Sequence, residues 1–253
     1  MNIIEGLFLG VLQGITEWLP ISSSGQSMLV LINILKIPPD EAFSISIALH
    51  LGSLFAVLYY FRGELLGISK NRELLISLII ATIISGIVGL PLYFGVKRFV
   101  SGISGEAVTM LIGLMLIITG LILRSRKPIT KKELNPINAA ITGAAQGAAV
   151  LPGISRSGTT IAALLLQEIE QETALRFSFL LAIPAILGLF FFESMNSGIV
   201  FHPPVMAGIV SSFIMSLATM HYFIKIAKDV DFSKFVIIVG VIAFTLPLAL
   251  TAF

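Results

Sequence analysis

The sequence predicts an all-α integral membrane protein: two inverted-topology repeats, with six transmembrane helices and two re-entrant helical hairpins that meet near the membrane midplane. Three observations lead to this prediction. The 253-residue chain is 56% hydrophobic but only 12% charged, which is about half the charge of an ordinary soluble domain. Several apolar runs reach the ~20 residues that a helix needs to cross a bilayer. A polar motif near the N-terminus recurs about halfway along the chain.

The first element is predicted to be a short hairpin. The apolar segment before Glu17 is too short to span, and Pro20 and a run of serines follow it. Such residues end helices, and a second short apolar run, 27–35, follows. We expect a re-entrant hairpin that dips to mid-membrane and returns. Broken backbone at that depth is tolerated only against protein or a water-filled cavity.

Three spans are predicted after this hairpin, at residues 43–61, 74–96 and 105–123. A second hairpin follows, with arms 137–151 and 159–166 that are separated by Pro152-Gly153, and then three more spans at 174–192, 205–224 and 235–252. Because three is an odd number, the second half must be inserted upside down relative to the first. Inverted repeats of this kind place their broken helices together near the bilayer midplane.

The two hairpins share a sequence motif. "GVLQGITEWLPISSSG" (10–25) aligns with "GAAQGAAVLPGISRSG" (143–158), so that Gln13 corresponds to Gln146 and Ser22 to Ser155. The chain is therefore predicted to be a single membrane domain, 1–253, with repeat 1 at about 1–126 and repeat 2 at about 134–253. The chain has no cysteine, which excludes disulfides and thiolate metal sites.

Loop charge predicts the orientation. The loops 62–73, 124–136 and 225–234 carry eleven Lys and Arg residues, and the loops on the other side carry three. Basic loops favour the cytoplasmic side. We therefore expect a multi-pass protein of the cell membrane whose site faces outside.

The second hairpin carries an arginine, Arg156, at membrane depth. An arginine there costs about 2.5–3.5 kcal/mol on insertion scales, and its planar guanidinium suits bidentate contact with phosphate. The surrounding "PGISRSGTT" supplies hydroxyls, and glycines that let backbone amides converge on an anion at a helix start. The alternative is that Arg156 only pairs with Glu17 as a structural bridge.

The first hairpin carries the complementary acid. Glu17 could ligate a divalent cation together with Gln13, one helical turn earlier, or act as a general base towards a serine. Alternatively, both residues only tie the hairpin tip to its neighbours. The adjacent serines are candidates for a nucleophile or phosphate donors, although serines at a break are also ordinary helix caps. His50 could face the same cavity, but a hydrogen-bonded interhelical histidine is the preferred interpretation. These residues predict a phosphate-handling site with apolar walls, which suits an amphiphile with a phosphate head.

At these residues the chain resembles the undecaprenyl-diphosphatase family, the bacitracin-resistance type of membrane phosphatase. The resemblance covers nearly the whole length. It rests on "QGITE" (13–17) as an (E/Q)xxxE motif, the following "WLPISSSG", "PGISRSG" (152–158) and "RFSFLLAIPAI" (176–186). It implies hydrolysis of a polyprenyl diphosphate to the monophosphate on the outer membrane face, which recycles the lipid carrier for cell-envelope glycans. It also implies a divalent cation, Mg2+ or Ca2+, as cofactor.

By position, the resemblance implies that Glu17 is the essential acid, Ser23 the proposed nucleophile and Arg156 the phosphate clamp. The expected metal ligands are Glu17 and Gln13. The expected substrate-binding residues are Gln13, Ser22, Ser24, Gln26, Gly153, Ser155, Ser157 and Thr160. The partners expected are a polyprenyl diphosphate lipid, the membrane and, as an alternative to a monomer, a second copy in a homodimer; no nucleic acid is expected.

One position departs from the family pattern. The family usually follows the serine cluster with Gly-His, whereas this chain has Gly25-Gln26. A glutamine can hydrogen-bond phosphate but cannot shuttle a proton near neutral pH. The departure therefore favours an alternative function, a polyprenyl-phosphate flippase with weak or no hydrolase activity, whereas the complete pair of motifs favours the enzyme.

Overall fold

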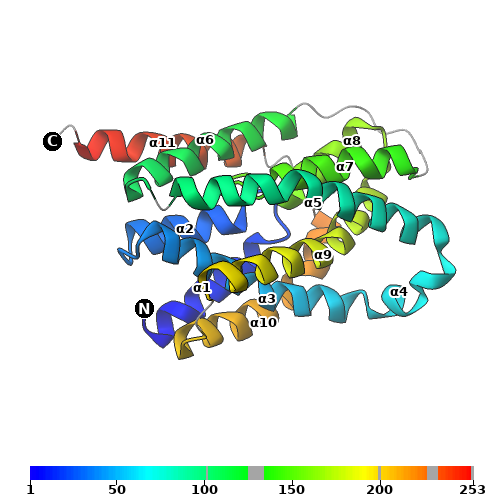
Figure 1. Cartoon of the computed structure of the whole chain (residues 1–253), viewed down its shortest axis with the longest axis horizontal. Coiled ribbons are helices and arrows are strands. Elements are labelled where there is room, and N and C mark those ends of the chain that lie inside the picture. The colour runs from blue at the N-terminus through cyan, green and yellow to red at the C-terminus, as the bar shows by residue number, and fades with distance from the viewer. Residues whose placement is uncertain (101, 125–133, 199–200, 227–232, 252–253) are drawn as a thin grey trace.

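The described part of the chain is helical, with no strand in residues 1–100, 102–124, 134–198, 201–226 and 233–251 of the computed structural model (Figure 1). The hairpin arms are α1 (Ile3–Thr16) and α2 (Ser23–Asn33), then α7 (Pro136–Ala148) and α8 (Arg156–Leu166). The longer helices are α3 (Pro39–Tyr60), α5 (Arg72–Val100), α6 (Gly105–Arg124), α9 (Gln171–Ser197), α10 (Pro203–Ile226) and α11 (Ser233–Thr251). Between α3 and α5 lie α4 (Arg62–Gly67) and the short 3-10 helix η1 (Ile68–Lys70).

Five helices within the described ranges are long and apolar enough to cross a membrane, namely α3, α5, α6, α9 and α10. They coincide with five of the six predicted spans. The sixth prediction, 235–252, falls on α11, whose described apolar stretch, Val236–Thr245, is shorter than a span; residue 252 is outside the described residues. The molecule is thus a multi-pass helical membrane protein. Of the basic residues that predict its orientation, Arg126, Lys127, Lys131, Lys132 and Lys228 lie outside the described residues.

The second arm of each hairpin begins earlier than the apolar runs predict. Helix α2 begins at Ser23 instead of residue 27, and α8 begins at Arg156 instead of residue 159. The reason is capping: the hydroxyl of Ser22 accepts a hydrogen bond from the Gly25 N–H at 3.3 Å, and Ser155 does the same for Gly158 at 3.0 Å. A serine cap satisfies amide groups that the first helical turn leaves open. The serine cluster and the arginine therefore stand in first helical turns.

Each hairpin packs its first arm against a long helix from the other half of the chain. Helix α1 lies along α10, and α7 lies along α5 (Figure 1). Both contacts are close because glycines face the partner: a Cβ atom on Gly10 would lie 2.0 Å from the Gly208 carbonyl oxygen, and one on Gly143 would lie 2.4 Å from that of Ala81. Small residues allow backbones in a membrane to approach in this way. The packing of each first arm on a helix from the other half of the chain fixes where each hairpin tip lies.

The hairpin tips are further held by packing and by direct contact. The buried ring of Trp18, in the first tip, meets the ring of Phe179 on α9 edge-on, with centroids 5.0 Å apart. The two tips touch at Gly25, where a Cβ atom would come within 3.2 Å of the Gly153 Cα. Gly153 itself has a φ of +94°, a conformation that glycine adopts readily. The break in one hairpin is therefore placed against the break in the other.

Candidate active site

The two hairpin tips bring a carboxylate and a guanidinium together. Glu17 follows the last turn of α1, and its Oε1 accepts a hydrogen bond from Nη2 of Arg156 at 2.6 Å. A second link joins the tips where the Ser157 hydroxyl donates to the Leu19 carbonyl oxygen at 3.0 Å. The side chains of Glu17 and Arg156 are 3% and 15% exposed. A charge pair this deeply buried is stable only when both members are compensated, and here each compensates the other.

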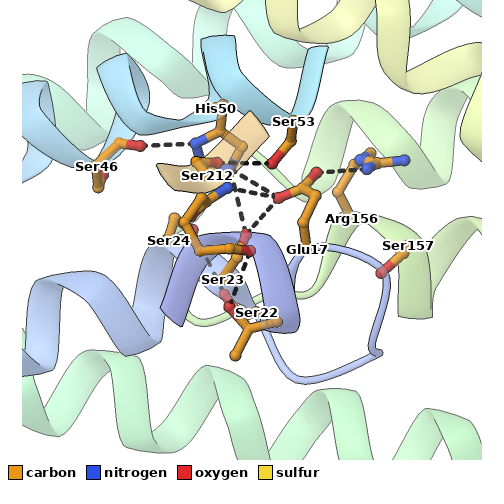
Figure 2. Close-up of polar contacts among 12 residues, drawn as sticks. Glu17, Ser22, Ser23, Ser24, Ser46, His50, Ser53, Arg156, Ser157 and Ser212 are labelled. Carbon is orange, nitrogen blue, oxygen red and sulfur yellow. Dashed lines mark hydrogen bonds and ion pairs between the residues drawn. The ribbon is translucent and has the colours of Figure 1, made fainter. Parts of the chain in front are cut away.

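The second carboxylate oxygen of Glu17 collects three further groups (Figure 2). The hydroxyl of Ser23 donates to Oε2 at 2.6 Å, and the amide Nε2 of Gln13 donates to it at 2.8 Å. Nε2 of His50 lies 3.3 Å from the same oxygen and 3.3 Å from Oγ of Ser23. Glu17 is therefore the hub of the cluster, and Ser23 is the hydroxyl it holds most closely.

Arg156 stands at the start of α8, where its guanidinium and the positive end of the helix can meet an anion together. Its Nη1 donates to the Ser178 carbonyl oxygen at 3.0 Å, and its Nη2 donates to Glu17. A guanidinium carries five N–H donors, so these two bonds fix its orientation and leave donors for a ligand. The N-terminus of a helix also carries a partial positive charge that favours phosphate. The arrangement suits an anionic group bound between α8 and Ser23.

These polar groups face a cavity of about 250 Å³. Its polar lining is Glu17, Ser22, Ser23, Ser24, Ser46, His50, Thr82, Ser85, Tyr93, Gln146, Ser155, Arg156 and Ser157. Its apolar lining includes Phe43, Ile47, Leu90, Val150, Ile154, Pro184, Ile186, Leu189 and Phe192. Pockets for drug-sized ligands measure about 300–1,000 Å³. A cavity of this size suits a polar head group, and a long lipid chain would lie mostly outside it.

Four of the predicted site residues lie beside the cavity lining instead of in it. Gln13 is fully buried, behind Glu17. Gln26 donates from Nε2 to the Ile21 carbonyl oxygen at 3.1 Å, which ties the tip to its own hairpin. Gly153 makes the contact between the tips. Thr160 donates to the Arg156 carbonyl oxygen at 2.8 Å and lies 2.6 Å from the Ser178 hydroxyl, so it supports the start of α8.

The residue that sequence reasoning set aside is His50. It projects from α3 into the cavity, with Nδ1 2.7 Å from the Ser46 carbonyl oxygen. The spacing of four between Ser46 and His50 places both on one face of a helix, and this spacing is the one sequence signal that could have suggested a common role. The site therefore combines side chains from the two hairpins with one from α3.

The chain is thus a helical membrane protein in which a buried carboxylate, arginine and serine lie around an apolar-walled cavity. Comparison with known proteins gives the family. The model of the bacitracin resistance protein BacA family matches residues 6–245, and the chain belongs to this family.

Several relatives are similar over almost their whole length. An undecaprenyl-diphosphatase of Methanothrix thermoacetophila is 42% identical, with all of this chain and 98% of the relative covered. Proteins of the same name from Methanopyrus kandleri and Methanococcoides burtonii are 41% and 39% identical. The first alignment covers 95% of this chain and 94% of the relative, and the second covers 96% and 97%.

Proposed function

We propose that this chain is a membrane phosphatase that hydrolyses a polyprenyl diphosphate to the polyprenyl monophosphate and inorganic phosphate. This reaction recycles the lipid carrier for cell-envelope glycan synthesis. The single observation that carries the proposal is the Ser23 hydroxyl, held 2.6 Å from a carboxylate whose other oxygen binds Arg156, at the wall of a small cavity. The names of the relatives agree with it.

The diphosphate head binds between α8 and the serine cluster. Arg156 and the amides at the start of α8 hold its oxygens and stabilise the negative charge that develops during phosphoryl transfer. The hydroxyls of Ser22 and Ser24, which also line the cavity, donate to the same oxygens. Since the arginine is already oriented by Glu17 and Ser178, little rearrangement is needed when the substrate binds.

Ser23 is the group that attacks the terminal phosphorus. Its Oγ forms a bond to phosphorus as the bond from phosphorus to the bridging oxygen of the polyprenyl phosphate breaks, and the hydroxyl proton passes to Glu17. Water then cleaves the phosphoserine, which releases inorganic phosphate and restores the Ser23 hydroxyl. The two steps together return both groups to their starting forms: one proton of the attacking water goes to Ser23 Oγ, and the proton held by Glu17 leaves with the released phosphate. One water molecule is therefore consumed in each turnover.

We also propose that Glu17 and Gln13 together take a divalent cation. The Oε1 of Gln13 is buried and has no hydrogen-bond partner among the described residues, and Nε2 of the same amide donates to the Glu17 carboxylate. Oxygen donors of this kind suit Mg2+ or Ca2+, and Mg2+ is commonly held by one or two carboxylates together with substrate phosphates. Glu17 and Gln13 would hold the cation, which would neutralise charge on the transferring phosphoryl group.

An assay of phosphate release tests the proposed function. The purified chain in detergent, mixed with a polyprenyl diphosphate and Mg2+ or Ca2+, should release phosphate, and Arg156→Ala should abolish the release. Arg176→Ala is the matched control, because Arg176 pairs with Glu64 at an exposed site away from the cavity. Absence of release by the unaltered chain, or equal release by Arg156→Ala, contradicts the proposal. Translocation of a polyprenyl phosphate in sealed vesicles without phosphate release would favour the flippase alternative.

We also propose that the chain crosses the cell membrane six times, as two inverted repeats at about 1–126 and 134–253 with the site open to the outside. The reciprocal packing of α1 on α10 and of α7 on α5 supports this arrangement, as does the excess of basic residues in the loops assigned to the inside. Because the chain has no cysteine, single cysteines at Lys36 and Lys70 can test it. An impermeant maleimide added to intact cells should label the first and not the second.

A further inference from the structure

We propose that His50 is a positioning residue for the proposed reaction: its imidazole aligns the Ser23 hydroxyl for attack. This inference rests on the proposed function and adds to it a residue from a third element, α3. Within the described residues, His50 is the one histidine that lines the cavity; His202 and His221 are exposed side chains at the two ends of α10. Its geometry relative to Ser23 carries the proposal.

The imidazole is fixed in one orientation. Nδ1 lies 2.7 Å from the Ser46 carbonyl oxygen, and a carbonyl oxygen can only accept, so Nδ1 is the nitrogen that donates. In the neutral ring this leaves Nε2 as an acceptor. Nε2 points to the hub of the site, 3.3 Å from both Ser23 Oγ and Glu17 Oε2. A base oriented by a third group and directed at a hydroxyl is the arrangement that activated nucleophiles generally use.

Ser23 needs a second acceptor because Glu17 is shared. The Glu17 carboxylate already receives Arg156, Gln13 and Ser23, and a bound cation would draw on the same oxygens. Before attack, when Glu17 is engaged by these groups, the Ser23 hydrogen can turn to His50 Nε2, which keeps the Oγ lone pairs directed towards the cavity. The proton passes to Glu17 as the bond to phosphorus forms. His50 therefore keeps the nucleophile aligned independently of Glu17.

The two flanking acceptors lie on different helices, and this makes the role of His50 specific. Glu17 approaches Ser23 from the end of α1, and His50 approaches from α3 (Figure 2). Gln26, which also carries an acceptor on α2, is bonded to the Ile21 carbonyl oxygen and does not line the cavity. Position 50 therefore supplies the imidazole of this site.

Steady-state kinetics of three variants test the inference, with the full chain in detergent and a polyprenyl diphosphate as substrate. His50→Leu removes the acceptor and should lower kcat on the order of 10²-fold with KM within about threefold, because misalignment of a reacting group has effects of that size. His50→Gln keeps an acceptor on a side chain of similar reach and should recover part of kcat. His221→Leu, at an exposed position, is the matched control and should behave as the unaltered chain does.

A double variant separates alignment of Ser23 from a general structural role. If His50 acts through Ser23, His50→Leu should lower the residual rate no further when Ser23 is already alanine. A kcat for His50→Leu within twofold of the unaltered chain, an equal loss in the Ser23→Ala background, or a change in KM alone would overturn the inference. In those cases release by the unaltered chain and its loss in Arg156→Ala would leave the proposed function standing. No release by the unaltered chain would overturn both.

Discussion

The contact between α1 and α10 positions Glu17, so a single methyl group placed in this contact should disturb both stability and activity. A Cβ atom at Gly10 would lie 2.0 Å from the Gly208 carbonyl oxygen and 2.0 Å from the Ser211 hydroxyl oxygen. The backbone oxygen cannot rotate away. The Ser211 hydroxyl can, but it would give up its 3.0 Å hydrogen bond to the Leu7 carbonyl oxygen. Because non-bonded heavy atoms need about 3.5 Å, α1 must move away from α10 by at least about 1 Å.

The expected effect of Gly10→Ala follows from this displacement. Overpacking of a close contact destabilises by about 1–3 kcal/mol, so thermal unfolding in detergent should begin at a lower temperature. Glu17 directly follows α1 and moves with it, and a 1 Å misplacement of a catalytic group reduces rates on the order of 10²-fold. The rate of phosphate release should therefore fall strongly even at temperatures where the variant is still folded.

Two further glycine variants complete the experiment. Gly143→Ala perturbs the corresponding contact of α7 with Ala81 on α5, where the Cβ atom would lie 2.4 Å from a carbonyl oxygen, and a loss of similar size is expected. Gly95→Ala is the control, because no atom lies within 4 Å of its Cβ position and alanine is the better helix former. If Gly10→Ala matches Gly95→Ala in both unfolding temperature and rate, the proposed coupling between this packing and the site is wrong.

Three other predictions concern the cavity and its surroundings. Lys97→Met removes a cation that pairs with the fully buried Glu193, and should destabilise the protein by about 3–5 kcal/mol. Adding Glu193→Gln to this variant should restore most of the unfolding temperature. A double variant as unstable as Lys97→Met would contradict this. Gly188→Leu places a side chain on a cavity-lining position with open space around it, and should raise KM about tenfold with the unfolding temperature unchanged. Chelation by EDTA should stop phosphate release, and Gln13→Leu should raise the Mg2+ concentration needed for half-maximal rate on the order of tenfold; full activity in EDTA would rule the cation out.

The helices could be predicted largely because apolar runs and helix-breaking prolines mark where they lie. Long apolar runs give α3, α5, α6, α9 and α10, and Pro20 and Pro152 mark the two breaks. For the helix that follows each break, the apolar runs predict a start three or four residues too late. The apolar runs begin after the serines, whereas capping by Ser22 and Ser155 starts each helix earlier. A cap depends on a single side-chain bond, which apolar periodicity does not register.

Sequence reasoning predicted only those residues of the candidate site that lie within a recognisable motif. Glu17, Ser23 and Arg156 stand within two long polar motifs, and polar groups at membrane depth are expensive enough to call for a partner. His50 is one histidine in an apolar helix, and its direction depends on how α3 packs against the hairpin. Sequence alone does not determine which face of a largely apolar helix meets which neighbour. The direction of the Gln26 side chain is equally hidden from the sequence, because a residue next to a motif can point back into its own hairpin, as Gln26 does towards the Ile21 carbonyl oxygen.

The two paired motifs differ at the positions that make up the site. When "GVLQGITEWLPISSSG" is aligned with "GAAQGAAVLPGISRSG", Ser23 corresponds to Arg156, and Glu17 corresponds to Val150. Ser23 and Arg156 are the first helical residues after equivalent serine caps, and they bind opposite oxygens of the same carboxylate. Two identical tips would present either two carboxylates or none, and like charges buried together are unfavourable. Because each motif supplies one half of the charge pair, Glu17 and Arg156 offset each other. In the proposed reaction the guanidinium and the hydroxyl would approach one phosphate from two sides.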